Sequence, residues 1–455
     1  MQFFTYDPSL GKVETPQGTM TLTKVFLPFF LEMFLMNFMG TVNTFMLSYF
    51  SDTAVAAVGA ASQFSGMIQT FYTVIGTGAS IVISHYLGAG KKEQTSDAVL
   101  CSLVLGGFLS LFVSLLISSL ALPCMRLMNI EGEILENAVD YFSICMRFSF
   151  LGALFSIISS VFKSYGFPRI SVGVSLGMNV LNALLNYLVI FQPVSFPLKG
   201  VSGIAWCNNF SRAAALACMV LLLLRLPLGL NFAHITWKSF SKIKAILGVG
   251  IPGGISSMSY NISQTVTTSI IALVGMSAIS TKIYVSNLVF YVYVLGMSLG
   301  LSTALLIGWL CGAGKYEQAY RLNLQNLKVT LLLNASLSIL LFLLGRPLLS
   351  LFTRDPIILK AGTTLLFFDI FVEIFRGFNH IEENSLRGAG DVVFPMVVSI
   401  CSCWVMSVLF SYILGVRLGL GLTGCWIAFA MDEAFRGINY FFRWKSKKWI
   451  KKTLT

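Results

Sequence analysis

Two groups of ionisable residues interrupt stretches of the chain that are otherwise apolar. In the first group, Glu373, Arg376 and His380 are spaced i, i+3 and i+7, which puts them on one face of a helix. A carboxylate beside a guanidinium forms an ion pair, whereas a carboxylate without one can hold a proton or a cation. The group can therefore either brace the fold or bind an ion.

The second group consists of Asp432, Glu433 and Arg436. In a helix, Arg436 can reach both acids, which precede it by four and three residues. Together with Asp369, the two groups hold four acids but only two guanidinium groups, so two acids must be protonated, hydrated or bound to a cation. Two interpretations stay open: neutralised ion pairs that lock this part of the fold, or a proton or cation site.

The N-terminal half of the chain has fewer charges in its apolar stretches, namely Glu32, Arg147 and Arg212. Glu32 is the only acid deep in this half, so we expect Arg147 or Arg212 to be its partner. In the C-terminal half, Lys282 lies close enough to the end of its apolar stretch for its side chain to reach the membrane interface.

Amides take the place of acids in the N-terminal half. Asn179, Asn182 and Asn186 share one helix face, since they too are spaced i, i+3 and i+7. Such amides commonly join neighbouring helices by hydrogen bonds, and they can also line a polar cavity. Both interpretations stay open.

Composition indicates which elements must position these residues. Hydrophobic residues make up 56% of the chain, charged residues only 11%, and the mean hydropathy is +0.80, whereas a soluble chain carries about 25% charged residues. Apolar runs of about 20 residues recur from end to end, long enough to cross a bilayer as helices. We therefore expect an all-α membrane protein with spans at about residues 24–49, 54–87, 98–122, 134–162, 170–192, 201–226, 246–274, 278–311, 322–344, 357–386, 392–414 and 420–442.

The chain contains an internal repeat. Leu87-Gly88-Ala89-Gly90-Lys91 returns as Cys311-Gly312-Ala313-Gly314-Lys315, 224 residues later, and the same offset pairs Pro28 with Pro252. Each copy holds six spans, so both copies enter the membrane from the same side and the repeats are parallel. We expect one lobe at residues 1–235, a second at 236–455, and a basic cytoplasmic tail at 443–455.

The placement of basic residues predicts the orientation. With the N-terminus inside, 20 Lys and Arg residues fall on the inner side and 6 in outer loops, so both termini are expected in the cytoplasm of a cell whose plasma membrane the chain crosses. The net charge of +12 is then explained by anionic headgroups, and no nucleic-acid partner is expected.

The same residues argue against an enzyme. A phosphate-binding P-loop needs Gly five residues before its Gly-Lys pair and Ser or Thr after it, but His85 and Lys92 stand there in the first copy. The nine cysteines have no metal-ligand spacing, and the three histidines are scattered. We expect no catalytic residues, no metal and no cofactor.

At this point the chain resembles the multidrug and toxic compound extrusion (MATE) transporters over nearly its whole length. The resemblance implies a V-shaped pair of six-helix lobes, alternating access, and export of amphipathic, often cationic, solutes driven by entry of H⁺ or Na⁺. It also implies a monomer among membrane lipids. The motifs that carry it are Pro28, Thr41-Val42-Asn43-Thr44, Ala56-Ala57-Val58-Gly59 with Gln63, the two Gly-Ala-Gly loops, Leu386-Arg387-Gly388-Ala389-Gly390-Asp391, and Gly421-Leu422-Thr423-Gly424-Cys425-Trp426.

Two departures limit what the resemblance implies about coupling. Members of the family typically have an Asp where this chain has Asn43, and many have a Glu near the position of Tyr260. The candidates for binding the coupling ion are therefore Glu373, Asp432, Glu433, Asp369 and Glu32, with Arg376, Arg436, Arg147 and Arg212 as charge partners. Candidates for a polar cavity are Asn43, Gln63, Asn179, Asn182, Tyr260, Asn379 and His380. An alternative function is a flippase for a lipid-linked saccharide, which would favour more spans and a cationic cavity.

Overall fold

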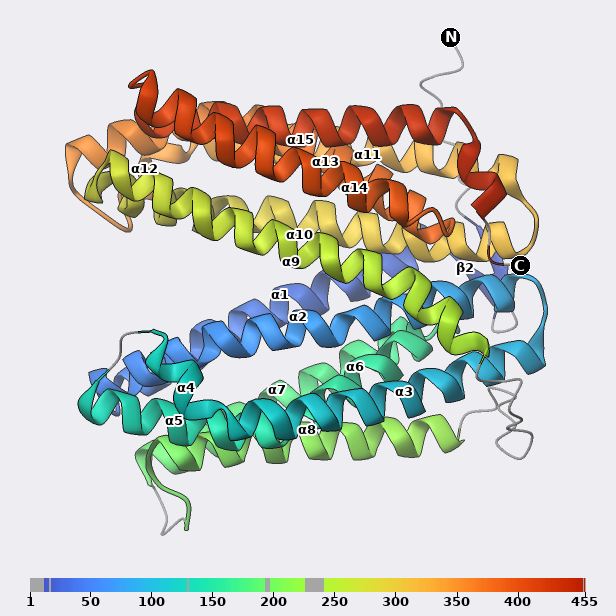
Figure 1. Cartoon of the computed structure of the whole chain (residues 1–455), viewed down its shortest axis with the longest axis horizontal. Coiled ribbons are helices and arrows are strands. Elements are labelled where there is room, and N and C mark those ends of the chain that lie inside the picture. Colours follow the sequence, from blue (N-terminus) through green and yellow to red (C-terminus); the bar gives the residue numbers. More distant parts are fainter. Residues whose placement is uncertain are drawn as a thin grey trace. The chain divides into compact units, whose positions relative to one another are not determined.

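The computed structural model describes residues 12–15, 18–128, 131–192, 197–225, 241–452 and 454. The chain is almost wholly helical, as predicted (Figure 1). Its contacts define two compact units. The first-half unit consists of Leu31–Leu87 and Lys91–Gly254, and the second-half unit consists of Met1–Phe30, Gly88–Gly90 and Ile255–Thr455. The predicted boundary between the halves, at residues 235 and 236, lies outside the described residues.

In the described residues of the first half, the chain forms six long helical segments. The fourth segment is bent by 45° where two helices meet at Phe148, and a short helix, α4 (Ala121–Arg126), precedes it. The long segments are α1 (Leu22–Ser48), α2 (Asp52–Gly88), α3 (Lys92–Ser119), α5 with α6 (Gly132–Arg147 and Ser149–Ser164), α7 (Pro168–Phe191) and α8 (Gly200–Arg225).

The part of the second half that the structure describes, from residue 241 on, also forms six long segments. Two pieces outside the predicted spans accompany them, α12 (Gly345–Leu349) and a terminal 3₁₀ turn at Lys448–Lys452. The long segments are α9 (Ser241–Val274), α10 (Met276–Gly312), α11 (Tyr316–Leu343), α13 (Pro356–Gly388), α14 (Val393–Ser402, continued by π-helical turns to Arg417) and α15 (Gly421–Lys445).

Length and composition mark most of these segments as membrane spans. In the described part of the chain, eight helices are long and apolar enough to cross a membrane, and the bent pair of α5 and α6 makes a ninth. The other three long helices are α9, which is rich in Ser, Thr and Gly, and α13 and α15, which carry the charged groups. The least apolar spans are therefore the ones that hold the candidate site.

The repeated glycine loops end their helices in the same way. α2 ends at Gly88 and α10 at Gly312, as predicted, and the following Gly90 and Gly314 have φ of +70° and +71°. Only glycine adopts this left-handed conformation without a steric cost. In each loop the next lysine N–H donates to a carbonyl five residues back, at 2.9 Å and 2.8 Å, which satisfies the free end of the helix.

The first helix of each half begins in the unit built by the other half. A hairpin of two strands, β1 (Val13–Thr15) and β2 (Gly18–Met20), and the first turns of α1 belong to the second-half unit. Conversely, residues 241–254 of α9 belong to the first-half unit. There α9 crosses α2 closely: a Cβ on Gly78 would lie 2.3 Å from the Ile246 carbonyl oxygen, and one on Gly250 would lie 2.3 Å from that of Val74.

α13 is the central helix of the second-half unit. It packs against α10, α11 and α15 (Figure 1). Its start is fixed by Asp355, whose side chain accepts a hydrogen bond from the Ile357 N–H at 2.8 Å, and by Pro356 at the first helical position. Because α13 is covered on three sides, polar groups along it must find partners inside the protein.

Candidate functional site

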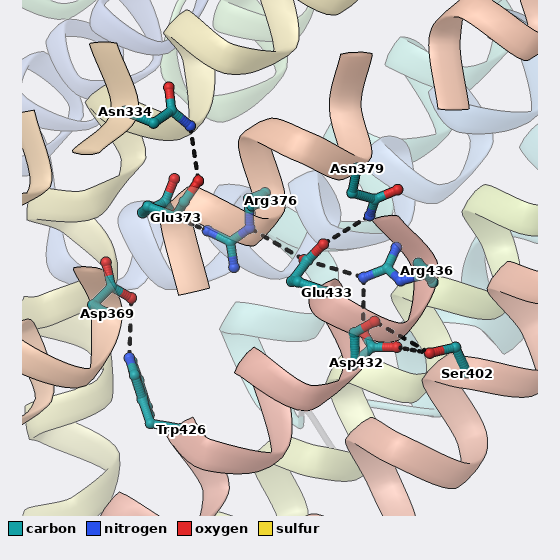
Figure 2. A network of polar contacts seen from close by, with 10 residues as sticks. All are labelled: Asn334, Asp369, Glu373, Arg376, Asn379, Ser402, Trp426, Asp432, Glu433 and Arg436. Atoms are coloured by element: carbon teal, nitrogen blue, oxygen red, sulfur yellow. Dashed lines mark hydrogen bonds and ion pairs between the residues drawn. The ribbon is translucent and has the colours of Figure 1, made fainter. Parts of the chain in front are cut away.

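The two charged groups predicted from the sequence meet in one buried network between α13 and α15 (Figure 2). Arg376 on α13 pairs with Glu373 on its own helix and, at 3.2 Å, with Glu433 on α15. Arg436 then pairs with Glu433 at 3.1 Å and with Asp432 at 2.7 Å. The charges alternate in sign along the chain of contacts, so each guanidinium is held by two carboxylates.

Neutral side chains complete the network. The Ser402 hydroxyl donates to Asp432 Oδ1 at 2.6 Å, and the Asn379 amide donates to Glu433 Oε2 at 2.7 Å. The Asn334 amide on α11 donates to the backbone carbonyl of Glu373 at 3.0 Å. These contacts come from three further positions in the fold, so a change of charge at one acid is felt by α11, α13, α14 and α15 together.

Asp369 stands apart from the ion pairs. It lies one helical turn before Glu373 and is 5% exposed. Its Oδ1 accepts a hydrogen bond from Trp426 Nε1 at 3.0 Å (Figure 2). Among the residues that the structure describes, no Lys, Arg or His forms an ion pair with it. Of the four clustered acids, Asp369 is therefore the one without a cation.

A small cavity of about 170 Å³ opens beside this network, within the second-half unit. Three of the four acids and two bases reach it, and aromatic rings form much of the rest of its wall. The lining residues are Tyr260, Gln264, Lys282, Ser286, Val289, Phe290, Tyr293, Asp369, Val372, Arg376, Trp426, Phe429, Asp432 and Glu433.

Of the residues predicted to line a polar cavity, Tyr260 does so and His380 does not, and the structure corrects the expectation for Lys282. Tyr260 lines it and lies 5.3 Å from the Arg436 guanidinium, measured to the ring centroid. His380 does not line it, and packs edge-on against the Tyr293 ring at 5.3 Å. Lys282 does not reach outward to the interface, because its amino group donates to the Thr268 hydroxyl and its side chain lines the cavity.

The first half brings its amides together. Asn182 accepts hydrogen bonds from Asn43 and Asn186, both at 3.2 Å, and donates to Asn208 at 2.5 Å. Asn208 in turn donates to the Tyr141 hydroxyl at 2.9 Å. This network joins α1, α5, α7 and α8 without any charge.

Other predicted residues of the first half are not part of that network. Asn179 has a buried Nδ2 with no hydrogen-bond partner in the described part of the chain. Gln63 is exposed on α2, and the described residues offer it no hydrogen bond.

The predicted partners of Glu32 are wrong. Glu32 pairs with Lys163 at the end of α6, at 2.6 Å. Arg147 is exposed at the bend between α5 and α6. Arg212 is partly buried and its side chain packs beside Gly152, 3.8 Å from where a Cβ on that glycine would lie. It forms no ion pair with any described residue. Lys163 stands one residue before the end of α6, and its pairing with Glu32 depends on how α6 packs against α1.

Sequence reasoning missed several members of the second-half site. Tyr293 and Ser402 are ordinary residues of apolar helices, and nothing in their spacing marks them. Trp426 ends a motif that carries the family resemblance, but the motif does not show that it contacts Asp369. Lys282 had a signal, since a base inside an apolar run is costly and usually faces the protein interior or a wet cavity. In the described part of the chain, no three His, Cys, Asp or Glu side chains group as a metal site would require.

Comparison with known proteins identifies the architecture. The MatE family matches residues 28–188 and 252–413, two stretches that begin at the prolines aligned by the internal repeat. An uncharacterized transporter of Bacillus subtilis, YisQ, is 33% identical over 435 residues, covering 95% of this chain and 96% of its own. A probable multidrug resistance protein, NorM, of Thermotoga maritima is 26% identical over 461 residues, covering 100% and 98%.

Solved structures agree on the fold. An outward-facing multidrug resistance MATE transporter of the MOP superfamily has a TM-score of 0.88 at 19% identity, over 99% of both chains. A MOP superfamily transporter from Pyrococcus furiosus has a TM-score of 0.85 at 20% identity, over 95% of this chain and 96% of its own. With both halves matched by one family and the whole chain covered by its relatives, this protein belongs to the MatE family of multidrug and toxic compound extrusion transporters, and has their multi-pass fold of two six-helix repeats.

Proposed function

We propose that the protein is a secondary antiporter of the plasma membrane, with both termini in the cytoplasm. It exports amphipathic, commonly cationic, organic solutes in exchange for H⁺ or Na⁺ by alternating access. The observation that supports this most directly is the cavity of the second-half unit, where Asp369 faces the interior without a cation partner. A buried acid of this kind inside a membrane span marks an ion path in many transporters.

The charges around the cavity favour exchange of a small number of ions. Counting from the sequence, four acids face two guanidinium groups. The structure adds Lys282 to the same cavity, so four acids face three bases and a single negative charge is left over. One proton or one Na⁺ neutralises that excess, and Asp369 is our candidate to bind it.

The network provides a way to convert ion binding into a rearrangement. Asp432 faces the cavity and holds Arg436 at 2.7 Å. When an ion entering from outside neutralises Asp369 or Asp432, the attraction between α13 and α15 changes, because these two helices carry all of the paired charges. A positively charged solute then loses its counter-charge and is released outward. The ion leaves toward the cytoplasm as the next solute binds.

The size of the cavity decides what it can hold. Pockets for whole drug-sized ligands enclose about 300–1,000 Å³, which is well above the 170 Å³ found here. The cavity therefore suits an ion or the charged end of a solute. Its aromatic rings, including Tyr260 and Trp426, present electron-rich faces that attract organic cations.

The available energy is sufficient. A charge that crosses 100 mV releases about 2.3 kcal/mol, and a tenfold concentration ratio of solute costs about 1.4 kcal/mol. Exchange of one proton for one monovalent cation moves no net charge, so the pH gradient alone drives it. A neutral solute exported by the same protein would also be driven by the membrane potential.

The flippase alternative is less well supported. A site for the phosphate groups of a lipid-linked saccharide should be cationic, whereas the cavity of the second-half unit carries three acids against two bases. The family match also favours export of small organic solutes.

The test is solute-triggered loss of a proton or sodium gradient in inside-out vesicles, screened with cationic dyes. We expect Asp369→Asn to abolish coupled export, because it keeps an acceptor for Trp426 but removes the charge. Glu373→Gln and Asp432→Asn are expected to reduce it strongly. Asn43→Ala, in the uncharged network of the first half, is the control and should keep most of the activity.

Two results would count against the assignment. Wild-type rates in all three acid variants would mean that the second-half charges only brace the fold. No response of the wild-type protein to either gradient with any cationic dye, with the protein present and folded, would exclude cation export.

A further inference from the structure

Glu382, the third acid along α13, lies outside the network and the cavity. Glu382 is fully buried, and it is nine residues from Glu373 toward the C-terminal end of α13. At 1.5 Å per residue this separation is about 13 Å. Its only described hydrogen-bond contact is a long one, 3.4 Å from the Asn323 amide nitrogen on α11 to Glu382 Oε2. Glu382 Oε1 is buried and has no partner among the described residues.

The charged groups around Glu382 do not compensate it. On its own helix, Glu383 pairs with Arg387 at 2.5 Å and His380 packs on Tyr293. α15 and its neighbours contribute Arg436, already held by two acids, and the pair of Arg443 with Asp391 at 2.7 Å. On α11, Asn323 contacts both Glu382 and Ser385, and Asn326, about one turn further, donates to Thr303 on α10. The neighbouring Ile381 belongs to an apolar cluster against which Leu22 and Phe26 of α1 pack.

The surrounding amides have unpaired acceptors. Asn323 donates to the Ser385 hydroxyl at 2.8 Å, and Asn326 donates to the Thr303 hydroxyl at 2.9 Å. The carbonyl oxygens of both amides are buried without a hydrogen-bond donor in the described residues. If Glu382 were ionised, its carboxylate would be one more hydrogen-bond acceptor beside amide oxygens that already lack donors. Burying such acceptors without donors costs a large desolvation free energy. One proton on the carboxyl group removes its charge and supplies a donor.

We propose that Glu382 is a second proton-binding site, formed by Glu382, Asn323 and Ser385 between α11 and α13 and separate from the acids of the cavity. The bound proton lies on the carboxyl group and is donated to an amide oxygen. No other cation is needed for the site to be neutral.

A row of polar side chains on α11 connects this site to the ion-pair network. Asn323, Asn326, Thr330 and Asn334 form one buried face of α11, spaced i, i+3, i+7 and i+11. Asn334 ends this row at the Glu373 carbonyl, at 3.0 Å, and Glu373 Oε2 is also buried without a hydrogen-bond partner in the described part. The row therefore leads from Glu382 to the ion-pair network. If antiport operates as proposed above, Glu382 holds the proton on its way between the network and the end of α13.

The first test measures the protonation of Glu382 itself and does not depend on transport. Infrared difference spectra of the purified protein in lipid, recorded between neutral and alkaline pH, should show the C=O stretch of a buried protonated carboxyl group. Glu382→Gln should remove that band. Glu383→Gln is the matched control: it changes the neighbouring, ion-paired carboxylate and should leave the band in place.

The outcomes separate the possibilities. A band lost in Glu382→Gln and kept in Glu383→Gln supports the proposal, even if no solute moves protons in vesicles. A wild-type spectrum whose carboxylate bands shift with Na⁺ at neutral pH, without a protonated band, would mean that the site holds sodium and the proposal is wrong. A protonated-carboxyl band that a folded Glu382→Gln variant leaves unchanged would belong to another acid, such as Asp369, and would also overturn it.

Discussion

The two halves of the molecule share a scaffold but differ in the chemistry of their interiors. Gly90 and Gly314 take nearly the same φ and end equivalent helices with the same backbone hydrogen bond. At positions that the repeat aligns, however, the first half has Asn208 and Asn209 where the second has Asp432 and Glu433. At these aligned positions one half has amides that join helices by hydrogen bonds, and the other has acids held in ion pairs. Duplication thus preserved the backbone features while the buried polar groups diverged.

This difference predicts which substitutions lower the stability of each half. An amide that loses its partner leaves one unpaired dipole, whereas a buried charge that loses its partner leaves an uncompensated ion, which costs several times more. Substitutions of aligned buried side chains should therefore lower stability by unequal amounts in the two halves. Substitutions that affect only the backbone conformation should have similar effects in both.

The largest contrast is expected at the arginines that the repeat aligns. Arg436→Met leaves Asp432 without a cation and takes one of two from Glu433, so we expect a loss of about 3–5 kcal/mol in the free energy of unfolding. Arg212→Met removes no described ion pair and should cost about 1 kcal/mol or less. Thermal unfolding of both variants in the same detergent measures the difference. Equal losses would show that Arg212 has an essential partner or that the Arg436 pairs contribute little.

A smaller effect is expected at the ion pair of the first half. Lys163→Met leaves Glu32 without its partner, but both side chains keep 13–14% exposure, so we expect a loss of about 1–3 kcal/mol. The double variant Glu32→Gln with Lys163→Met should recover part of it, because no charge is left unpaired. A double-mutant cycle by thermal unfolding gives the coupling directly. A coupling near zero would contradict the contact.

The smallest effect, and the one expected to be equal in the two halves, is at the repeated loops. Gly90→Ala and Gly314→Ala force a side chain into the left-handed region at a cost of about 1–2 kcal/mol each. A Cβ at either position meets no atom within 4 Å, so the cost is that of the backbone alone. Gly390→Ala is the comparison, since its Cβ would also lie 2.7 Å from the Lys452 carbonyl oxygen, and it should be worse. Unequal losses for the first two would mean that the loops have different roles.

Much of the fold could be predicted because membrane helices are recognisable by composition alone. The repeat fixed the number of segments in each half and their relative direction, and the glycine loops fixed two helix ends. The hairpin at Val13–Met20 and the short helices α4 and α12 were not predicted, because they are short and their apolar residues form no regular pattern.

The candidate site could be predicted in part. Spacing within a helix brought Arg436 to Asp432, since that distance is set by helix geometry. Pairing between helices depends on how they pack, which the sequence does not give, so Lys163 was missed as the partner of Glu32. The cavity beside Asp369 and the row of amides on α11 likewise arise from three or more helices together. In the sequence, Glu382 stands only six residues before the loop that begins at Gly388, and only the fold shows that it is fully buried.

Because α1 and α9 each begin in the unit that the other half builds, the two units depend on each other during synthesis of the chain. The hairpin and the first turns of α1 leave the ribosome first, yet the surface that they pack on is made of residues synthesised after Ile255. The start of α9 completes the earlier unit only once the chain has passed the linker. Neither half is therefore finished by its own residues alone: the first-half unit needs the chain as far as Gly254, and the second-half unit joins the start of α1 to residues made after Ile255. Duplication of a gene gave two copies, but the copies now assemble as one obligate product.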